Sequence, residues 1–153
     1  MDCSSKAAQL LASRPHFRAE LAAKLRRREF PEDEIAAALD RLEAQGYLDD
    51  RKTAADFIAH RRERGGEGKL RLRAELVRRG AASAAIDEAL AGLDEEDDQA
   101  AAREAAERWR RQKGGGSRPE NPAALARHLA RKGFSQRAIV AVLKAPFEDF
   151  EPE

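Results

Sequence analysis

Basic side chains are concentrated in the middle of this sequence, where they could bind a polyanion. Between residues 61 and 79 there are eight lysines and arginines and three acids, which leaves a local net charge of +5. The eight are Arg61, Arg62, Arg64, Lys69, Arg71, Arg73, Arg78 and Arg79. Such a cluster can attract phosphates or an acidic protein surface. Cations at helix ends also offset the helix dipole, by about 0.3–1 kcal/mol each, so a merely solvated face is the competing interpretation.

The other reactive residue types form no catalytic pattern. His16, His60 and His128 lie far apart, and none has a partner at the spacing of metal ligands. The glycine-rich stretch 65–68 follows an expected helix and not a strand, so it does not match a nucleotide-binding loop. The single cysteine, Cys3, excludes an intramolecular disulfide and is expected to be an incidental thiol. We therefore expect a protein that is not an enzyme and uses no cofactor or metal.

The composition favours helices. Of the 153 residues, 32 are alanine, which has the highest helix propensity and buries little surface. The chain is nearly neutral, with 29 lysines and arginines against 28 acids, so the net charge does not identify a partner. No apolar run approaches the roughly 18 residues of a membrane span, and no signal peptide is recognisable at the start. We expect several thin helical cores in a cytoplasmic protein with no membrane contact.

Helical periodicity extends over most of the chain, and no segment alternates with a period of two, so we expect no sheet. A glycine-rich linker at 114–122 and a tail at 146–153 are expected to be flexible. The expected helices cover residues 7–13, 17–28, 31–46, 51–64, 69–80, 84–93, 94–113, 122–132 and 135–143. At the start of the fourth of them, Asp50 or Asp49 can act as the cap.

One pattern of apolar residues occurs three times. Counted from the second leucine of each copy, the same offsets hold Leu21, Leu25, Ile35 and Leu39, then Leu72, Leu76, Ile86 and Leu90, then Leu125, Leu129, Ile139 and Leu143. We expect these twelve side chains to form the structural core. The fold class is therefore predicted as all-α, with three tandem three-helix, helix-turn-helix-like repeats in an elongated, curved array. The predicted boundaries are 1–49, 50–93 and 94–145.

The helical corners have the spacing of a DNA-reading helix-turn-helix core, as in Leu76-x3-Gly80-x5-Ile86. In that motif the helix after the turn enters the major groove, so acids at its start are repelled by the phosphates. The helix after the first corner begins with PEDEI, and the one after the second with ASAAIDE. Only the third, with Ser135-Gln136-Arg137, suits base reading. A nucleic-acid-binding protein of this type is therefore the alternative interpretation.

The segment Gly46–Gly80, GYLDDRKTAADFIAHRRERGGEGKLRLRAELVRRG, resembles the signature stretch of the RecX family of bacterial recombination regulators. That signature has a Gly-Tyr-Leu-Asp-Asp connector, a helix with a basic end, a glycine turn and a Glu-Leu-x-x-x-Gly helix. The matching positions are Tyr47, Asp49 and Asp50 in the connector, Arg61, Gly65 and Gly68 at the basic end and turn, and Leu76 and Gly80 in the next helix. The sequence departs from the family pattern at Lys52-Thr53, at Glu29, where glycine is common, and in its long linker.

This resemblance implies a non-enzymatic modulator of the RecA recombinase, built of three three-helix repeats. Such proteins associate with the RecA filament on single-stranded DNA and usually restrain its recombinase, ATPase and co-protease activities. The expected partner is therefore the RecA filament, with single- and double-stranded DNA as further partners and the chain acting as a monomer. The basic residues from 61 to 79 are the expected contact surface.

Overall fold

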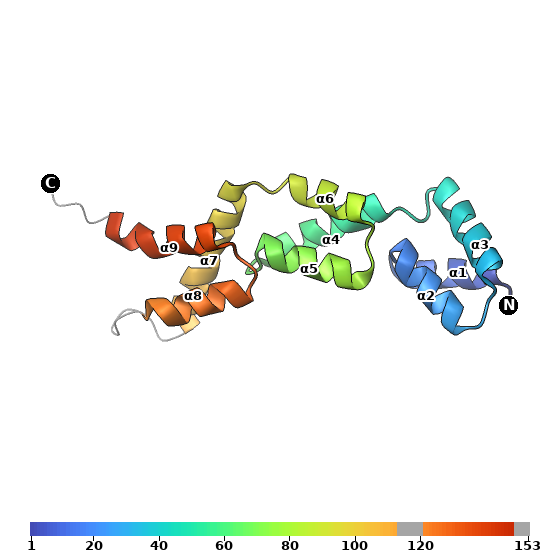
Figure 1. The fold of residues 1–153 in the computed structure, drawn as a ribbon, viewed down its shortest axis with the longest axis horizontal. Coiled ribbons are helices and arrows are strands. Elements are labelled where there is room, and N and C mark those ends of the chain that lie inside the picture. The colour runs from blue at the N-terminus through green and yellow to red at the C-terminus, as the bar shows by residue number, and fades with distance from the viewer. Residues whose placement is uncertain (113–120, 149–153) are drawn as a thin grey trace. The chain divides into compact units, whose positions relative to one another are not determined.

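The computed structural model describes residues 1–112 and 121–148, with side chains described as far as residue 144. The predicted linker therefore lies outside the description up to residue 120, and most of the predicted tail lies outside it as well. Within these ranges the chain forms helices and no strand, in line with the absence of period-two alternation (Figure 1). In chain order they are α1 (Cys3–Ser13), α2 (Arg18–Arg27), α3 (Glu32–Ala44), α4 (Asp50–Arg64), α5 (Lys69–Arg79), α6 (Ser83–Ala91), α7 (Glu95–Gln112), α8 (Pro122–Arg131) and α9 (Gln136–Glu148).

Short polar side chains define several helix starts. The Asp2 carboxylate accepts a hydrogen bond from the Ser5 backbone N–H at 2.7 Å, which starts α1 earlier than the sequence predicts. Asp94 and Asp97 each accept a bond from the other's backbone N–H at 2.9–3.1 Å, so Asp94 lies before α7 and not in it. At α4 the cap is Asp49, whose Oδ1 accepts from Arg51 N and Lys52 N.

The chain divides into two compact units. Unit 1 comprises residues 1–57 and 75–89, and unit 2 comprises residues 58–74 together with those from 90 onward. Helices α4, α5 and α6 contribute residues to both units, because the chain passes between the units within each of them. Each unit is described by itself below.

In unit 1, α1, α2 and α3 pack on one another around an aliphatic core (Figure 1). Leu21, Leu25, Ile35 and Leu39 are buried there, together with Cys3 and other small or aliphatic side chains. Cys3, expected from the sequence to be an incidental thiol, is a free cysteine whose side chain fills part of this core. The first-repeat leucines lie four residues apart, which places them on one helix face.

In unit 2, α7, α8 and α9 pack on one another in a second core (Figure 1). Leu125, Leu129 and Ile139 are buried, whereas Leu143 is only partly buried and packs against the same cluster. Alanines on α7 supply its side of the core, so this helix approaches its neighbours closely. Trp109 packs against the cluster, with its ring centroid 6.2 Å from that of His128.

The middle repeat buries the corresponding positions. Leu72, Leu76, Ile86 and Leu90 are each at most 2% exposed, as tightly buried as the leucines of the first repeat. Each of the three helical corners holds one residue with a positive φ, four positions after the second leucine of its repeat. These residues are Glu29 (φ 68°), Gly80 (φ 88°) and Gly133 (φ 87°).

Candidate functional site

A single carboxylate joins two helix starts in unit 1. The Oδ1 atom of Asp50 accepts a hydrogen bond from the Arg18 backbone N–H at 2.8 Å, at the start of α2. Its Oδ2 atom accepts one from the Ala82 backbone N–H at 3.0 Å, just before α6. These N–H groups lie at or just before helix starts, where backbone N–H groups have no intrahelical acceptor and a negative charge is favoured. Asp50 therefore holds a helix of the first repeat to one of the second, and we call this contact the first junction.

Asp98 makes the same pair of contacts in unit 2. Its Oδ1 accepts from the Lys69 backbone N–H at 2.9 Å, at the start of α5, and its Oδ2 accepts from the Ser135 backbone N–H at 3.4 Å, before α9. Asp98 is buried, and Ser135 also donates from its hydroxyl to Glu95 at 3.2 Å. We call this contact the second junction. Asp98 is not among the site residues that the sequence predicts, so its linking role was missed.

Several residues of the basic segment make hydrogen bonds inside unit 2. Arg61 forms a two-point ion pair with Glu67 at 2.9 and 3.1 Å, and both side chains are mostly buried. Arg62 donates to the Asp97 carbonyl at 3.1 Å. The Lys69 ammonium donates to the Leu93 carbonyl at 2.9 Å. These three cations are committed to the fold, in contrast to the outward surface that the sequence predicts.

The other predicted contact residues are placed differently. Arg71 is exposed but donates to the Arg131 carbonyl at 3.3 Å and lies 3.7 Å from Glu67. Arg64 and Arg73 are exposed. Of the family-signature connector, Tyr47 is 72% exposed, whereas Asp49 and Asp50 bind backbone N–H groups as described above. Arg78 and Arg79, at the end of the segment, are also exposed, and both line a concave surface.

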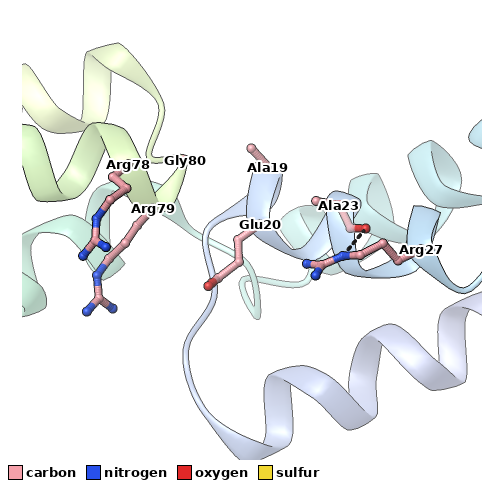
Figure 2. A pocket seen from close by; sticks show the side chains of 7 residues that line it. All are labelled: Ala19, Glu20, Ala23, Arg27, Arg78, Arg79 and Gly80. Atoms are coloured by element: carbon pink, nitrogen blue, oxygen red, sulfur yellow. Dashed lines mark hydrogen bonds between the residues drawn. The ribbon is translucent and has the colours of Figure 1, made fainter.

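Arg78 and Arg79 line a pocket of about 420 Å³ in unit 1. Figure 2 shows α5 and its corner on one side of this pocket and α2 on the other, with Arg27 pointing in from α2. Its lining residues are Ala19, Glu20, Ala23, Arg27, Arg78, Arg79 and Gly80. The pocket therefore brings together arginines from equivalent positions of the first and second repeats, which the sequence could not reveal.

The charges around this pocket are only partly balanced. Its carboxylate, Glu20, already receives two hydrogen bonds from Arg14 at 2.9 and 3.3 Å. Arg78 and Arg79 share the carboxylate of Glu75, at 2.7 and 3.4 Å. The Arg79 guanidinium also lies 5.0 Å from the centroid of the Phe57 ring, a cation–π contact that orients it. Two guanidinium groups thus share one acid, which leaves excess positive charge at the pocket.

A second concave surface of about 340 Å³ adjoins α2 and shares Arg27 with the pocket. Lys24, Arg27, Arg28 and Leu10 line it. The buried His16 orients Lys24, whose ammonium lies 2.8 Å from the His16 Nε2 atom. Because an ammonium can only donate, Nε2 is the acceptor, and Nδ1–H donates to the Arg14 carbonyl at 2.9 Å. Burial lowers the pKa of His16, which favours this neutral form.

Two kinds of site are absent from the part of the chain that the structure describes. Across residues 1–112 and 121–144, no group of three or more histidine, cysteine, aspartate or glutamate side chains is arranged to hold a metal ion. None of the helices in the described part of the chain is long and apolar enough to cross a membrane.

The comparisons with known proteins agree on one family. The model of the first three-helix domain of RecX matches residues 3–42, and the model of its second three-helix domain matches residues 49–90. The chain belongs to the RecX family. The regulatory protein RecX of Mycolicibacterium vanbaalenii is 38% identical over 143 residues, covering 90% of this chain and 78% of the relative. That of Pseudomonas entomophila is 41% identical over 140 residues, covering 90% and 86%.

Solved RecX structures have the same fold. The crystal structure of RecX from Lactobacillus salivarius superposes with a TM-score of 0.82 and covers 93% of this chain and 92% of its own, at 19% identity. A second RecX crystal structure gives a TM-score of 0.80 at 23% identity and covers 92% of this chain. The predicted all-α class and helical repeat fold are thereby confirmed.

Proposed function

We propose that this chain binds the RecA recombinase filament on single-stranded DNA and restrains its recombinase, ATPase and co-protease activities. Membership of the RecX family carries the proposal, because the relatives are named as regulatory proteins. The Gly46–Gly80 segment resembles the family signature, and it is this resemblance that implies RecA as the partner. We further propose that the chain acts as a cytoplasmic monomer, without catalysis and without a cofactor.

The exposed arginines of the basic segment are the proposed contact surface. Arg61, Arg62 and Lys69 bind acceptors within unit 2, so charge reversal there would damage the fold before it affected a partner. Arg64, Arg73, Arg78 and Arg79 are exposed. They can meet an acidic protein surface or DNA phosphates without breaking the core, and their charge would mainly accelerate association.

Co-sedimentation with RecA filaments tests this proposal. We expect the chain to pellet with filaments on single-stranded DNA and to lower their rate of ATP hydrolysis. The variant Arg64→Glu/Arg73→Glu/Arg78→Glu should lose most of both effects. The matched control Arg103→Glu/Arg111→Glu/Arg127→Glu reverses three other exposed arginines and should retain both. Failure of the unaltered chain to pellet with filaments would reject RecA as the partner.

The helix-turn-helix alternative is not favoured by the helices that follow the corners. Helix α3 begins with Glu32, Asp33 and Glu34, and α6 carries exposed Asp87 and Glu88 in its first two turns. Glu88 pairs with Arg51 at 3.2 Å, which fixes this acid on the surface of unit 1. Carboxylates there would face DNA phosphates if either helix entered a major groove. Tight binding to one defined duplex sequence without RecA would reverse this preference.

A further inference from the structure

The connector between α3 and α4 lines a pocket of about 450 Å³ in unit 1, which we call the connector pocket. Its walls are residues 11–16 at the end of α1, Gly46, Tyr47 and Asp49 of the connector, and Lys52, Thr53 and Asp56 of α4. We propose that the connector pocket binds the arginine side chain of a partner protein. None of the residues of the basic segment lines it, and the proposal does not rest on RecA as the partner.

The backbone at the end of α3 presents Tyr47 at this pocket. Gly46 has a φ of 80°, and its N–H donates to the Glu43 carbonyl at 3.0 Å. The Tyr47 N–H donates to the Leu42 carbonyl at 2.9 Å, which completes the Schellman motif that ends many helices. The Leu48 side chain is buried directly after it, whereas the Tyr47 side chain is 72% exposed. Tyr47 therefore adds little to the core, and the backbone holds its ring ready for a partner.

The end of α1 supplies hydrogen-bond acceptors to the pocket. Because Arg14 follows the helix in an extended conformation, with φ −169° and ψ 163°, the chain does not cap the last turn with its own backbone. The carbonyls of Leu11, Ala12 and Ser13 accept no hydrogen bond from the residues that the structure describes. These carbonyls carry the partial negative charge of a helix C-terminus. The end of α1 therefore favours a cation with several N–H donors.

The charged side chains of the connector pocket add further acceptors. Within the part of the chain that the structure describes, the exposed Asp56 carboxylate forms no ion pair or hydrogen bond. Asp49 uses Oδ1 to accept the backbone N–H groups at the start of α4, so its Oδ2 atom stays available. Arg14 is neutralised by Glu20, which lies outside the lining, through hydrogen bonds of 2.9 and 3.3 Å. Two carboxylates and the end of α1 thus outweigh the ammonium of Lys52.

A guanidinium matches this arrangement better than an ammonium does. It is planar and has five N–H donors, so it can reach carbonyl and carboxylate acceptors together while it stacks on an aromatic ring. A cation above a tyrosine ring is also attracted by the negative face of that ring. The volume of the connector pocket is typical of ligand pockets, and tyrosine and arginine are enriched where protein interfaces bind most strongly. An arginine that projects from a protein surface therefore suits both the acceptors and the exposed Tyr47.

NMR titration of the isotope-labelled chain with N-acetyl-arginine amide tests the connector pocket directly. We expect the backbone amide signals of Ser13, Tyr47 and Thr53 to shift and those of unit 2 to stay in place. The initial slope of the shift against probe concentration measures relative affinity even when binding is weak. N-acetyl-citrulline amide has nearly the same shape without the charge, so its slope should be at least about tenfold smaller. N-acetyl-lysine amide should also give a smaller slope, since its ammonium has fewer donors and does not stack.

Three substitutions of exposed residues separate the parts of the site. Tyr47→Leu keeps an apolar side chain but removes the ring, so it should lower the slope for the arginine probe about threefold. Asp56→Asn should lower it about threefold, because a charged acceptor is lost. Lys52→Gln should raise the slope, because it removes the competing cation. The control Asp33→Asn removes a charge from another exposed residue of unit 1, outside the pocket, and should leave the slope nearly unchanged.

Several outcomes would overturn the proposal. Unshifted pocket amides, or equal slopes for the arginine and citrulline probes, would show that no guanidinium is recognised. A larger slope with N-acetyl-glutamate amide would identify an anion site at Lys52, and a larger slope with free arginine would identify a small-molecule site. An equal loss in Asp33→Asn and Asp56→Asn would show a diffuse charge effect. Unchanged circular-dichroism melting shows that each variant keeps its fold. Because RecA is absent, co-sedimentation with filaments can succeed or fail independently of this result.

Discussion

The first and second junctions are built by equivalent aspartates, but they differ in how far they are buried. In each, one aspartate accepts backbone hydrogen bonds from the start of the second helix of one repeat and the start of the third helix of the next. Asp50 at the first junction is half-buried, whereas Asp98 at the second is 3% exposed. The two aspartates therefore make the same pair of hydrogen bonds, but the second junction is more closed to solvent than the first.

Additional backbone contacts account for the closure of the second junction. The Gly68 N–H donates to the Lys132 carbonyl at 2.7 Å, and the Leu70 N–H donates to the Gly133 carbonyl at 3.0 Å. A Cβ placed on Gly133 would overlap the backbone of Arg71. At the first junction the corner residue Gly80 has a looser neighbour, since its Cβ would lie 3.3 Å from the Ala19 Cβ. The pocket of Figure 2 lies at this looser corner.

Equivalent positions of the first two repeats are occupied differently at the two junctions. Ala19 and Leu70 each lie six residues before the second leucine of their repeat, and Glu20 and Arg71 each lie five before it. At the second junction, Leu70 donates to Gly133 and Arg71 to Arg131, so the site of the hollow is taken up by the chain itself. The same repeat register thus gives a closed junction in one place and a pocket in the other.

Alanine at the two corner glycines should lower the free energy of unfolding most, and by different amounts. Gly133→Ala should cost about 3–5 kcal/mol, because a left-handed non-glycine residue is strained and its Cβ would also displace Arg71. Gly80→Ala should cost about 1–2 kcal/mol, because it carries the strain without the overlap. Urea unfolding followed by circular dichroism measures both. Equal costs would contradict the proposed difference in closure.

Removal of the junction carboxylates should give the next largest effects. Asp98→Ala should cost about 2–4 kcal/mol, since two backbone N–H groups lose their acceptor in a buried place, and Asp50→Ala about 1–2 kcal/mol, since water can replace its half-buried carboxylate. Hydrogen exchange should accelerate at Lys69 and Ser135 in the first variant, and at Arg18 and Ala82 in the second. The exposed acids Glu96 and Asp56 provide control alanine variants, which should leave all four amides unchanged.

Acid should affect unit 1 through His16. Because burial lowers the pKa of His16 in the folded state, the unfolded chain takes up a proton first, near pH 6.5. The stabilisation is complete above pH 6.5 and is lost as the pH falls below it, when Lys24 and Arg14 repel the imidazolium while Glu20 partly offsets them. His16→Gln should make the free energy of unfolding depend less on pH in this range. Urea midpoints at pH 7.5 and pH 5.5 measure it, and an equally steep loss in the variant would exclude His16 as the cause.

The corner of the first repeat should give the smallest effect, in the opposite direction. Glu29 adopts a φ of 68° where the other corners have glycine. Glu29→Gly should raise the free energy of unfolding by about 0.5–1 kcal/mol, the relieved strain being partly offset by the entropy of glycine in the unfolded chain. Glu29→Ala removes the same charge while keeping the strained conformation, so it should not stabilise. Thermal melting of the two variants separates strain from charge.

The leucine register of the sequence predicted most of the fold. Eleven of the twelve predicted core side chains are buried, because offsets of four residues place them on one face of a helix. Leu143 is the exception and is partly buried near the end of the side-chain description. The predicted repeat boundaries at 49/50 and 93/94 remain predictions, since the two compact units are not the three repeats.

The junction aspartates were harder to predict because the register shifts before them. Asp50 lies 26 residues before Leu76, whereas Asp98 lies 31 residues before Leu129, so counting from the leucines does not align them. The signal they share is local. Each is followed four residues later by an alanine that is fully buried, Ala54 or Ala102.

The pocket lined by Arg27 and Arg78 depends on tertiary contacts that no local pattern contains. Arg27 and Arg78 are 51 residues apart in sequence, yet they line one pocket. Conversely, Arg61 and Arg62 are adjacent in a basic run, yet both donate to acceptors inside unit 2. Charge density along a sequence therefore predicted a basic surface but not which cations compose it.

Because Cys3 is buried, the rate at which its thiol reacts should report how often unit 1 opens. The chain has one thiol, it lies in the core of unit 1, and burial raises its pKa, so both access and thiolate formation require opening of α1. With a disulfide reagent in excess, the Cys3 thiol would then react at the rate at which unit 1 opens. Any nucleic acid or protein that closes around α2 would slow this single reaction, without a label or an engineered residue.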